Sequence, residues 1–438
     1  MPTVLLWQRR WLIALGAALV AIAVGLSVVG SRRAWFIVVA VPIAYAPFAY
    51  ARLRLFRRLT APLAGRRAVA SVAGGAAAVC DALMVAQLLT ARGGGGVPGL
   101  QAVGLDWVGP VWFSAHALAA LLYGGRGLLR QAVRPLARWW RNRASAAATE
   151  AGVDLGRRQF LQQFSVVGAA APFAVSLSGV PLSYDFRVEE RELELPGWPR
   201  RLDGLRVAHL SDIHVGGAMD RTRLLDVAAL TAAARPDLIL HTGDFLTHRR
   251  GDFDAPLYEA LARLAPRYGQ WACLGNHDFD DPERLVGKLR AAGVRVLRDE
   301  LAVLDVAGQP LEIGGLDFCF DRANRAAVAA RRINRWPARG TAPRLLLDHD
   351  PSQFALLPDG CADLVLSGHT HGGHVGLQLG RDTALTVVGL VGYPDQGVFT
   401  RGAMRLFVTR CVGFYGYPMR VGIPPEIALL TLRAPPSV

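Results

Sequence analysis

The pattern of hydrophobic and polar positions changes near residue 183. Before that point, long uncharged apolar runs alternate with short arginine-rich segments. A helix that crosses a bilayer needs about 20 predominantly apolar residues, and the spacing and arginine flanks of these runs favour spans over buried core helices. The runs therefore predict five membrane-spanning helices, at Trp11–Gly30, Ala34–Tyr50, Ala68–Thr90, about Val103–Tyr123 and about Phe164–Leu182.

Arginine residues predict how these spans are oriented. Six arginines lie between the second and third spans and eight follow the fourth, whereas the glycine-rich loop 91–104 has only Arg92. Cytoplasmic loops are enriched in Lys and Arg, so both arginine-rich loops are expected inside, although Arg32 and Arg33 fall on the other side. Counting the spans then places residues 184–438 outside the cytoplasm.

A short segment before the fifth apolar run supports the same direction. The residues Gly156-Arg157-Arg158-Gln159-Phe160-Leu161 resemble a twin-arginine export signal. The segment is equally compatible with an ordinary basic flank of a membrane span. Both interpretations send the C-terminal part outward.

After Tyr184 the pattern is one of short apolar runs that alternate with helical segments. This alternation predicts an α/β domain with right-handed crossovers, and the remaining chain is long enough to bury a large core. The predicted strands are Leu205–Leu210, Leu238–His241, Trp271–Leu274, Leu311–Leu316, Arg344–Leu347 and Leu364–Leu366. The predicted helices are Arg221–Ala234, Leu257–Leu264, Pro282–Ala292 and Ala326–Ile333.

Polar clusters follow five of these strands directly. They are Asp212-Ile213-His214, Gly243-Asp244, Gly275-Asn276-His277-Asp278, Asp348-His349 and Gly368-His369-Thr370-His371. Open α/β sheets bind ligands at the carboxyl ends of their strands, so the clusters are expected to converge. Asp, Asn and His ligands without thiolate suit Mn, Fe or Zn.

Two of the clusters contain pairs of ligand-type residues separated by one position, Asp212-x-His214 and His369-x-His371. In an extended segment, residues two apart point to the same side. We therefore expect both members of each pair to face one site.

Composition agrees with a chain of two different parts. Hydrophobic residues make up 52%, charged residues 19%, and the mean hydropathy is +0.26, which is too apolar for an ordinary soluble globule. Residues 1–183 contain 19 Arg and 4 acidic residues, a net charge of 19 − 4 = +15, so the positive charge of the chain, +14 in total, lies in that part. The remaining 30 basic and 31 acidic residues nearly balance, which argues against a nucleic-acid-binding surface. Five scattered cysteines without CxxC spacing indicate neither a disulfide framework nor a thiolate zinc site.

The ordered series DxH, GD, GNHD, a lone His and GHTHGG resembles the calcineurin-like metallophosphoesterases, in particular their membrane-associated bacterial branch. The resemblance covers about residues 185–438, including the closing segment 420–426. It implies an αββα sandwich preceded by an α-helical multi-span membrane domain. The expected organisation is a four-span domain at 1–145, a basic linker with the fifth run or twin-arginine-like segment at 146–183, and the metallophosphoesterase domain at 184–438.

The resemblance further implies a dinuclear site for two divalent ions, most consistent with Mn, Fe or Zn. One ion would be bound by Asp212, His214, Asp244 and His371, and the other by Asp244, Asn276, His349 and His369, with Asp244 bridging. His277 would stabilise developing charge or protonate the leaving oxygen, and Asp278 would orient it.

Four further histidines and Cys411 are not part of the predicted ligand set. His209 and His241 lie inside apolar strands and are read as hydrogen-bonded core residues. His248 and His374 remain candidates for a supporting or substrate contact. We expect Cys411 not to change the metal site.

The function expected from these features is metal-dependent hydrolysis of a phospholipid or lipid-linked phosphate outside the cytoplasm, in the cell membrane. One alternative is a cytoplasmic-facing pyrophosphatase on a nucleotide-activated acylated sugar. Another is a non-catalytic scaffold with the same fold, against which the full set of ligand types argues. The sequence leaves the oligomeric state and the choice between monoester and diester open.

Overall fold

The computed structural model describes residues 174–216, 219–247, 254–414 and 418–436, together with a few isolated positions before residue 174. The predicted spans lie almost wholly outside these residues, and so does His248. Of the fifth apolar run, residues 174–182 are described and helical. Within the described residues, no helix combines the length and the apolar character needed to cross a membrane. Contacts divide the chain into two units, and residues 175–438 belong to the second of them.

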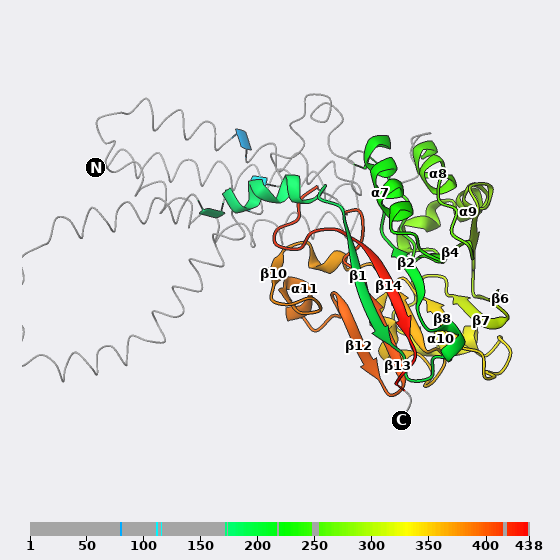
Figure 1. Cartoon of the computed structure of the whole chain (residues 1–438). Coiled ribbons are helices and arrows are strands. Elements are labelled where there is room, and N and C mark those ends of the chain that lie inside the picture. The colour runs from blue at the N-terminus through cyan, green and yellow to red at the C-terminus, as the bar shows by residue number, and fades with distance from the viewer. Residues whose placement is uncertain are drawn as a thin grey trace, which may run out of the picture. The chain divides into compact units, whose positions relative to one another are not determined.

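Two six-stranded sheets form the centre of this second unit (Figure 1). The first has the order β1 (Arg187–Glu194), β14 (Glu426–Arg433), β2 (Leu205–Leu210), β3 (Leu238–His241), β4 (Gln270–Ala272) and β5 (Val294–Val296). The second has the order β12 (Gly397–Arg401), β13 (Met404–Val408), β9 (Leu364–Ser367), β8 (Arg344–Leu347), β7 (Gln309–Gly315) and β6 (Glu300–Val306). A separate two-stranded sheet pairs β10 (Gly376–Gln378) with β11 (Ala384–Thr386).

Parallel pairing dominates the centre of both sheets. Strands β2 to β5 are parallel to one another, and so are β7, β8, β9 and β13. Parallel strands require crossover connections, and α7 (Arg221–Ala233), α8 (Ala255–Ala262) and α9 (Pro282–Ala291) supply them for the first sheet. The carboxyl ends of the parallel strands in each sheet consequently lie along one edge.

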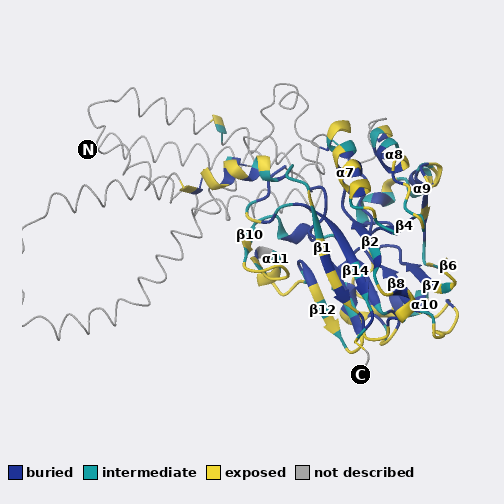
Figure 2. Ribbon diagram, in the orientation of Figure 1, coloured by how far each residue is buried: buried dark blue, intermediate teal, exposed yellow. Residues whose placement is uncertain are grey.

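Three apolar clusters define the layers of the domain. The cluster between the sheets combines inward residues of both, such as Val207 and Leu240 with Leu345 and Leu366. A second cluster packs the other face of the first sheet against α7, α8 and α9, and a third packs the second sheet against α10 (Arg325–Ile333). Figure 2 shows central strands such as β2, β14 and β8 buried, whereas the outer faces of α7 and α8 are exposed. The predicted αββα sandwich is therefore confirmed for this unit, and each predicted strand and helix is present with ends that differ by up to two residues.

Two glycines allow a test of this packing. Gly287 lies exposed within α9, and an added Cβ would meet no atom within 4 Å. We expect Gly287→Ala to stabilise the domain by about 1 kcal/mol, because alanine has the higher helix propensity. A Cβ at Gly315, by contrast, would lie 2.6 Å from Leu297 Cβ, so Gly315→Ala should destabilise it by about 1–3 kcal/mol. Urea denaturation of the full chain in detergent, followed by pulse proteolysis, measures both effects. Equal effects of the two substitutions would contradict the packing described here.

Candidate metal centre

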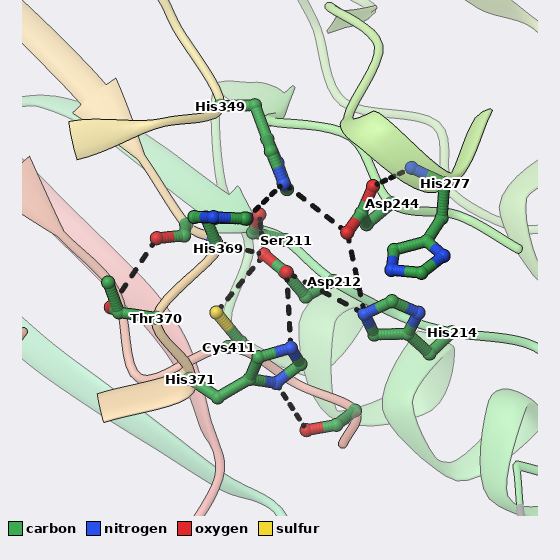
Figure 3. Close-up of polar contacts among 12 residues, drawn as sticks. Ser211, Asp212, His214, Asp244, His277, His349, His369, Thr370, His371 and Cys411 are labelled. Atoms are coloured by element: carbon green, nitrogen blue, oxygen red, sulfur yellow. Dashed lines mark hydrogen bonds and ion pairs between the residues drawn. The ribbon is translucent and has the colours of Figure 1, made fainter. Parts of the chain in front are cut away.

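Side chains from five strand ends meet at one place (Figure 3). Asp212 and His214 follow β2, Asp244 follows β3, and His349 follows β8. The 3-10 helix η3 (Asn276–Asp280) after β4 carries Asn276, His277 and Asp278, and the segment after β9 carries His369 and His371. The strand ends that the sequence predicts as sources of ligands therefore converge as expected.

The first group of possible metal ligands consists of Asp212, His214 and His371, whose ligand atoms all lie within 4.8 Å of one another. Asp212 Oδ1 is 3.2 Å from His371 Nε2 and 3.7 Å from His214 Nε2. The rings of His214 and His371 are stacked, with centroids 5.1 Å apart. All three residues are buried.

The second group consists of Asp244, His349 and His369. His349 Nε2 lies 3.3 Å from Asp244 Oδ2 and 3.1 Å from His369 Nδ1. Asn276 joins this group, because its Oδ1 is 3.2 Å from His349 Nε2. The same four residues were assigned to the second ion by resemblance.

Asp244 lies between the two groups. Its Oδ2 is 3.3 Å from His349 Nε2 and 3.6 Å from His214 Nε2, while its Oδ1 accepts a 2.8 Å hydrogen bond from the His277 backbone N–H. One carboxylate oxygen thus faces a ligand nitrogen from each group. This position suits a residue that bridges two ions.

Residues behind the ligands fix which atoms face the centre. Asp212 Oδ2 accepts hydrogen bonds from Ser211 Oγ (2.5 Å), the His369 backbone N–H (2.9 Å) and Cys411 Sγ (3.2 Å). Asp212 Oδ1 is left as a buried oxygen that accepts no hydrogen bond from the described residues. His349 Nδ1 donates to the Thr242 carbonyl at 2.6 Å, which leaves its Nε2 toward the second group.

The ionisation of these groups fits divalent cations. Although burial opposes it, the neighbouring His371 and His349 hold the pKa of Asp212 well below its usual range. Burial likewise opposes ionisation of Asp244, but His349 and His214 lower its pKa to about 2. Burial lowers the pKa of His214 to about 3 and that of His369 to about 4, so both are neutral. Ionised carboxylates and neutral imidazoles without thiolate are the donor set that Mn, Fe and Zn accept.

The backbone at the ligands is unusual. Asp212, His214, Asp244, His369 and His371 all have positive φ, between 49° and 67°. Few non-glycine residues adopt this conformation, which costs about 1–3 kcal/mol each and concentrates at functional sites. The expectation that the Asp212-x-His214 and His369-x-His371 pairs share a side because they are extended is therefore wrong. They face one site because left-handed turns redirect them.

Glycines permit this crowded arrangement of turns. A Cβ at Gly368 would lie 2.0 Å from Ser211 Oγ and 2.2 Å from Asp212 Oδ2. A Cβ at Gly275 would lie 2.2 Å from Asp244 Oδ1. Any side chain at either position would displace a ligand carboxylate.

Asp278 connects two of the loops that carry ligands. Its carboxylate accepts hydrogen bonds from the backbone N–H groups of Gly275 (2.9 Å), Asp244 (2.7 Å) and Phe245 (2.9 Å). Burial and the nearby Asp244 raise its pKa to about 8. Asp278 therefore holds the backbone of the Asp244 loop against that of Gly275, and its orientation of His277 stays a prediction. That ring lies beside His214, with centroids 5.2 Å apart.

The remaining histidines differ in their surroundings. His209 Nε2 lies 2.9 Å from Thr242 Oγ1 and His241 Nε2 lies 3.2 Å from Gln270 Oε1, which confirms them as hydrogen-bonded core residues. His374 packs its ring 4.7 Å from that of His371, at the start of the β10 hairpin.

Sequence reasoning missed the residues that support the ligands. Ser211, Thr242 and Cys411 carry no metal-ligand pattern, and Cys411 contacts a predicted ligand although it was expected to leave the site unchanged. Their roles depend on contacts between distant segments, such as the 199 positions that separate Cys411 from Asp212. Ser211 immediately precedes the DxH pair and Thr242 immediately precedes the GD pair, so adjacency to a motif was the one signal that could have found these two.

Comparison with known proteins finds relatives of this chain. Residues 205–373 match the model of a family described as calcineurin-like phosphoesterase. An uncharacterized metallophosphoesterase of Aquifex aeolicus is 29% identical over 57% of this chain and 93% of its own length. Phosphodiesterase YaeI of Escherichia coli is 27% identical over 52% of this chain and 82% of its own length. The UDP-2,3-diacylglucosamine pyrophosphatase LpxG of Chlamydia trachomatis is 24% identical over 56% of this chain and 88% of its own length.

Proton release on metal binding tests the electrostatics of the second group. Burial opposes protonation of His349, but Asp244 and Asp212 raise its pKa to about 10, so it is protonated at pH 7 without metal. A metal ligand must be a neutral imidazole, and binding should release about one proton. Metal affinity should therefore rise with pH up to about 10. Titration calorimetry in two buffers with different ionisation enthalpies measures the release.

The matched control for that measurement is His349→Asn. The variant retains the Asp212 group, which can still bind metal, and its proton release should be smaller. Binding enthalpies of the native chain that do not depend on the buffer would contradict the proposed charge on His349.

Proposed function

We propose that this calcineurin-like metallophosphoesterase hydrolyses phosphate esters with a large apolar group, such as a phospholipid or a lipid-linked phosphate or diphosphate. Metal-dependent phosphoester hydrolysis follows from the family match and the two groups of ligands. The choice of an apolar substrate rests on one observation, an aromatic wall beside the second group of ligands.

This aromatic wall consists of Phe279, Phe318 and Phe320. The ring of Phe318 lies 5.9 Å from those of both His349 and His369. Phe320 packs edge-on against Phe318 at 4.8 Å and against Phe279 at 5.3 Å, yet 60% of its surface is exposed. A large exposed aromatic side chain next to polar ligands offers apolar contact to whatever group is attached to a bound phosphate.

Each part of the site has a role in such a reaction. Two divalent ions, bound by the ligands described above, would polarise phosphate oxygens and lower the pKa of the attacking water. His277 lies next to Asp244 and His214 and is only partly buried on η3, which suits a donor of the proton to the leaving oxygen. The aromatic wall would hold the apolar group and thereby orient the scissile bond.

The proposed location is the cell membrane, with the catalytic domain outside the cytoplasm. This proposal rests on the apolar runs before residue 183 and on the arginines between them. A catalytic domain attached to a membrane meets lipid phosphates at high local concentration, which favours the same substrate class.

A second candidate is hydrolysis of the diphosphate bond of a nucleotide-activated acylated sugar on the cytoplasmic side. The name of the Chlamydia trachomatis relative favours it, because that protein is a pyrophosphatase for an acylated sugar nucleotide. The aromatic wall would accept an acyl chain in this case too. The side of the membrane that the catalytic domain faces distinguishes the two candidates.

Metal-dependent turnover is the first test of the proposed activity. The metal-stripped full chain should hydrolyse p-nitrophenyl phosphate or bis-p-nitrophenyl phosphate only after Mn, Fe or Zn is restored. Asp244→Asn should lower turnover by at least about 100-fold, because it weakens the ligand that faces both groups. Asp226→Asn, on the exposed side of α7, should have no effect. Folded, metal-loaded protein without turnover would favour the scaffold alternative.

Substitution of the aromatic wall tests the substrate class. Phe320→Ala should lower kcat/KM about tenfold for an acylated phospholipid in mixed micelles, since one large apolar contact is lost. The deacylated form of the same compound should lose little. Val303→Ala, at a 64% exposed position on β6, is the matched control. Equal losses for both compounds would count against an apolar subsite at the wall.

A further inference from the structure

Exposed apolar side chains gather on one segment of the domain. Fourteen large apolar residues are exposed in the described part of the chain, and six of them lie between residues 377 and 393. Single exposed apolar residues are normal on soluble proteins, whereas a contiguous group marks an interaction site. The six are Leu377, Leu379, Leu385, Leu390, Val391 and Tyr393, and Leu390 and Val391 are the most exposed at 71% and 74%.

Hydrogen bonds hold this segment in a defined shape. Leu377 on β10 is paired with Leu385 on β11, so the two side chains share a face of the hairpin. The Thr386 hydroxyl oxygen caps α11 (Val387–Leu390) by accepting from the Gly389 N–H at 2.9 Å. The Thr370 hydroxyl, one residue before His371, donates to the Asp395 carbonyl at 2.7 Å. The apolar residues are therefore presented by an ordered structure that is connected directly to the metal ligands.

The helix at residues 174–182 and this hairpin both contact residues 420–421. The Arg420 N–H donates to the Gly179 carbonyl at 2.9 Å, and the Gly376 N–H donates to the Val421 carbonyl at 2.9 Å. A Cβ at Gly179 would lie 2.8 Å from the Arg420 carbonyl oxygen, so the helix packs closely there. Its outward residues Val175 and Leu177 are 38% and 51% exposed. Figure 2 shows exposed residues on both this helix and α11.

We propose that these residues form a docking surface for a lipid bilayer, which holds the metal centre at the level of the lipid headgroups. The docking surface comprises Val175, Leu177, Leu377, Leu379, Leu385, Leu390, Val391 and Tyr393. It would enter the boundary between headgroups and acyl chains with its apolar side chains, as interfacial amphipathic elements do.

Two further observations favour a bilayer as the occupant. Residues 383–393 contain no charged side chain, so nothing in this stretch opposes insertion. The helix at 174–182 is also the end of the fifth apolar run, and the 19 arginines and long apolar runs precede it. The chain therefore leaves the catalytic domain beside the docking surface and continues into its most membrane-like part.

The docking surface begins a few residues after the metal ligands, so its contact with a bilayer would bring the metal centre close to lipid headgroups. His371 is five residues before Gly376, the first residue of β10, and the His374 ring between them packs on the His371 ring. A phosphate in the headgroup layer would therefore lie near the ligands while its acyl chains stay in the bilayer. The use of this contact in catalysis rests on the proposed function, whereas the contact with the bilayer does not.

Quenching of a fluorescent label by lipids tests whether the docking surface enters the bilayer. The full chain, with Cys80→Ser, is reconstituted in phosphatidylcholine and phosphatidylglycerol vesicles; its other four cysteines are buried. An environment-sensitive label is attached at Leu390→Cys or, as the matched control, at Val303→Cys on β6. Nitroxide lipids should quench the label at position 390 and leave the label at position 303 unquenched.

Two results of that measurement would overturn the proposal. One is equal quenching of both labels by aqueous iodide, which would place residue 390 in water. The other is a label at 390 that is shielded from iodide and yet is not quenched by nitroxide lipids, which would mean that another segment of this chain or a second copy covers the surface.

Activity on a vesicle-embedded substrate and on a soluble one tests whether contact with the bilayer aids catalysis. Leu390→Asp combined with Val391→Asp should lower hydrolysis of a vesicle-embedded phospholipid about tenfold, because two inserted apolar groups are replaced by charges. Hydrolysis of a soluble p-nitrophenyl ester should not change, and Val303→Asp should affect neither. If the native chain hydrolyses no lipid, the proposed function fails while the label measurement still decides the docking surface. Equal activity of the double variant on vesicles, with the native chain active, would overturn the catalytic use of the contact.

Discussion

Two buried carboxylates impose the main constraint on this domain. Asp212 and Asp244 are 0% and 2% exposed, and both stay ionised. Buried charge is strongly unfavourable unless opposite charge or hydrogen-bond donors compensate it. Without metal, the protonated His349 and the donors on Asp212 Oδ2 provide that compensation. The centre is therefore assembled for positive charge, which the metal ions supply in place of the proton.

The sandwich makes this concentration of charge possible. The ligands follow strands that are buried on both faces, and the apolar clusters fix those strands independently of the site. The ligand residues keep their left-handed backbone, and Gly275 and Gly368 keep their close contacts, because the packed strands on either side hold these turns in place. The packed layers thus stabilise the domain, whereas the strained backbone lies in the turns at the strand ends.

The sequence predicts the parts of this structure that depend on local pattern. Central strands such as β3 and β8 are short, mainly apolar runs, LILH and RLLL, and the polar motif after each is visible directly. The charged edge strand β1, RVEERELE, gives no such signal. It is a strand because it pairs in parallel with β14, the last strand in the sequence. The support of Asp212 by Cys411 and the left-handed turn at His214 arise from tertiary packing. Motif spacing identified the ligand types, whereas the way each ligand reaches the centre required the structure.

The metal centre, the aromatic wall and the docking surface lie on connected segments. Phe318 contacts the second group from the side of His349 and His369, while His371 of the first group leads through His374 into β10. A phosphate bound between the groups would thus have the apolar side chains of the wall beside the second group. Because water competes for charged groups, apolar surroundings strengthen the interaction of the ions with phosphate oxygens. The same apolar residues that would select a lipid therefore also favour the chemistry at its phosphate.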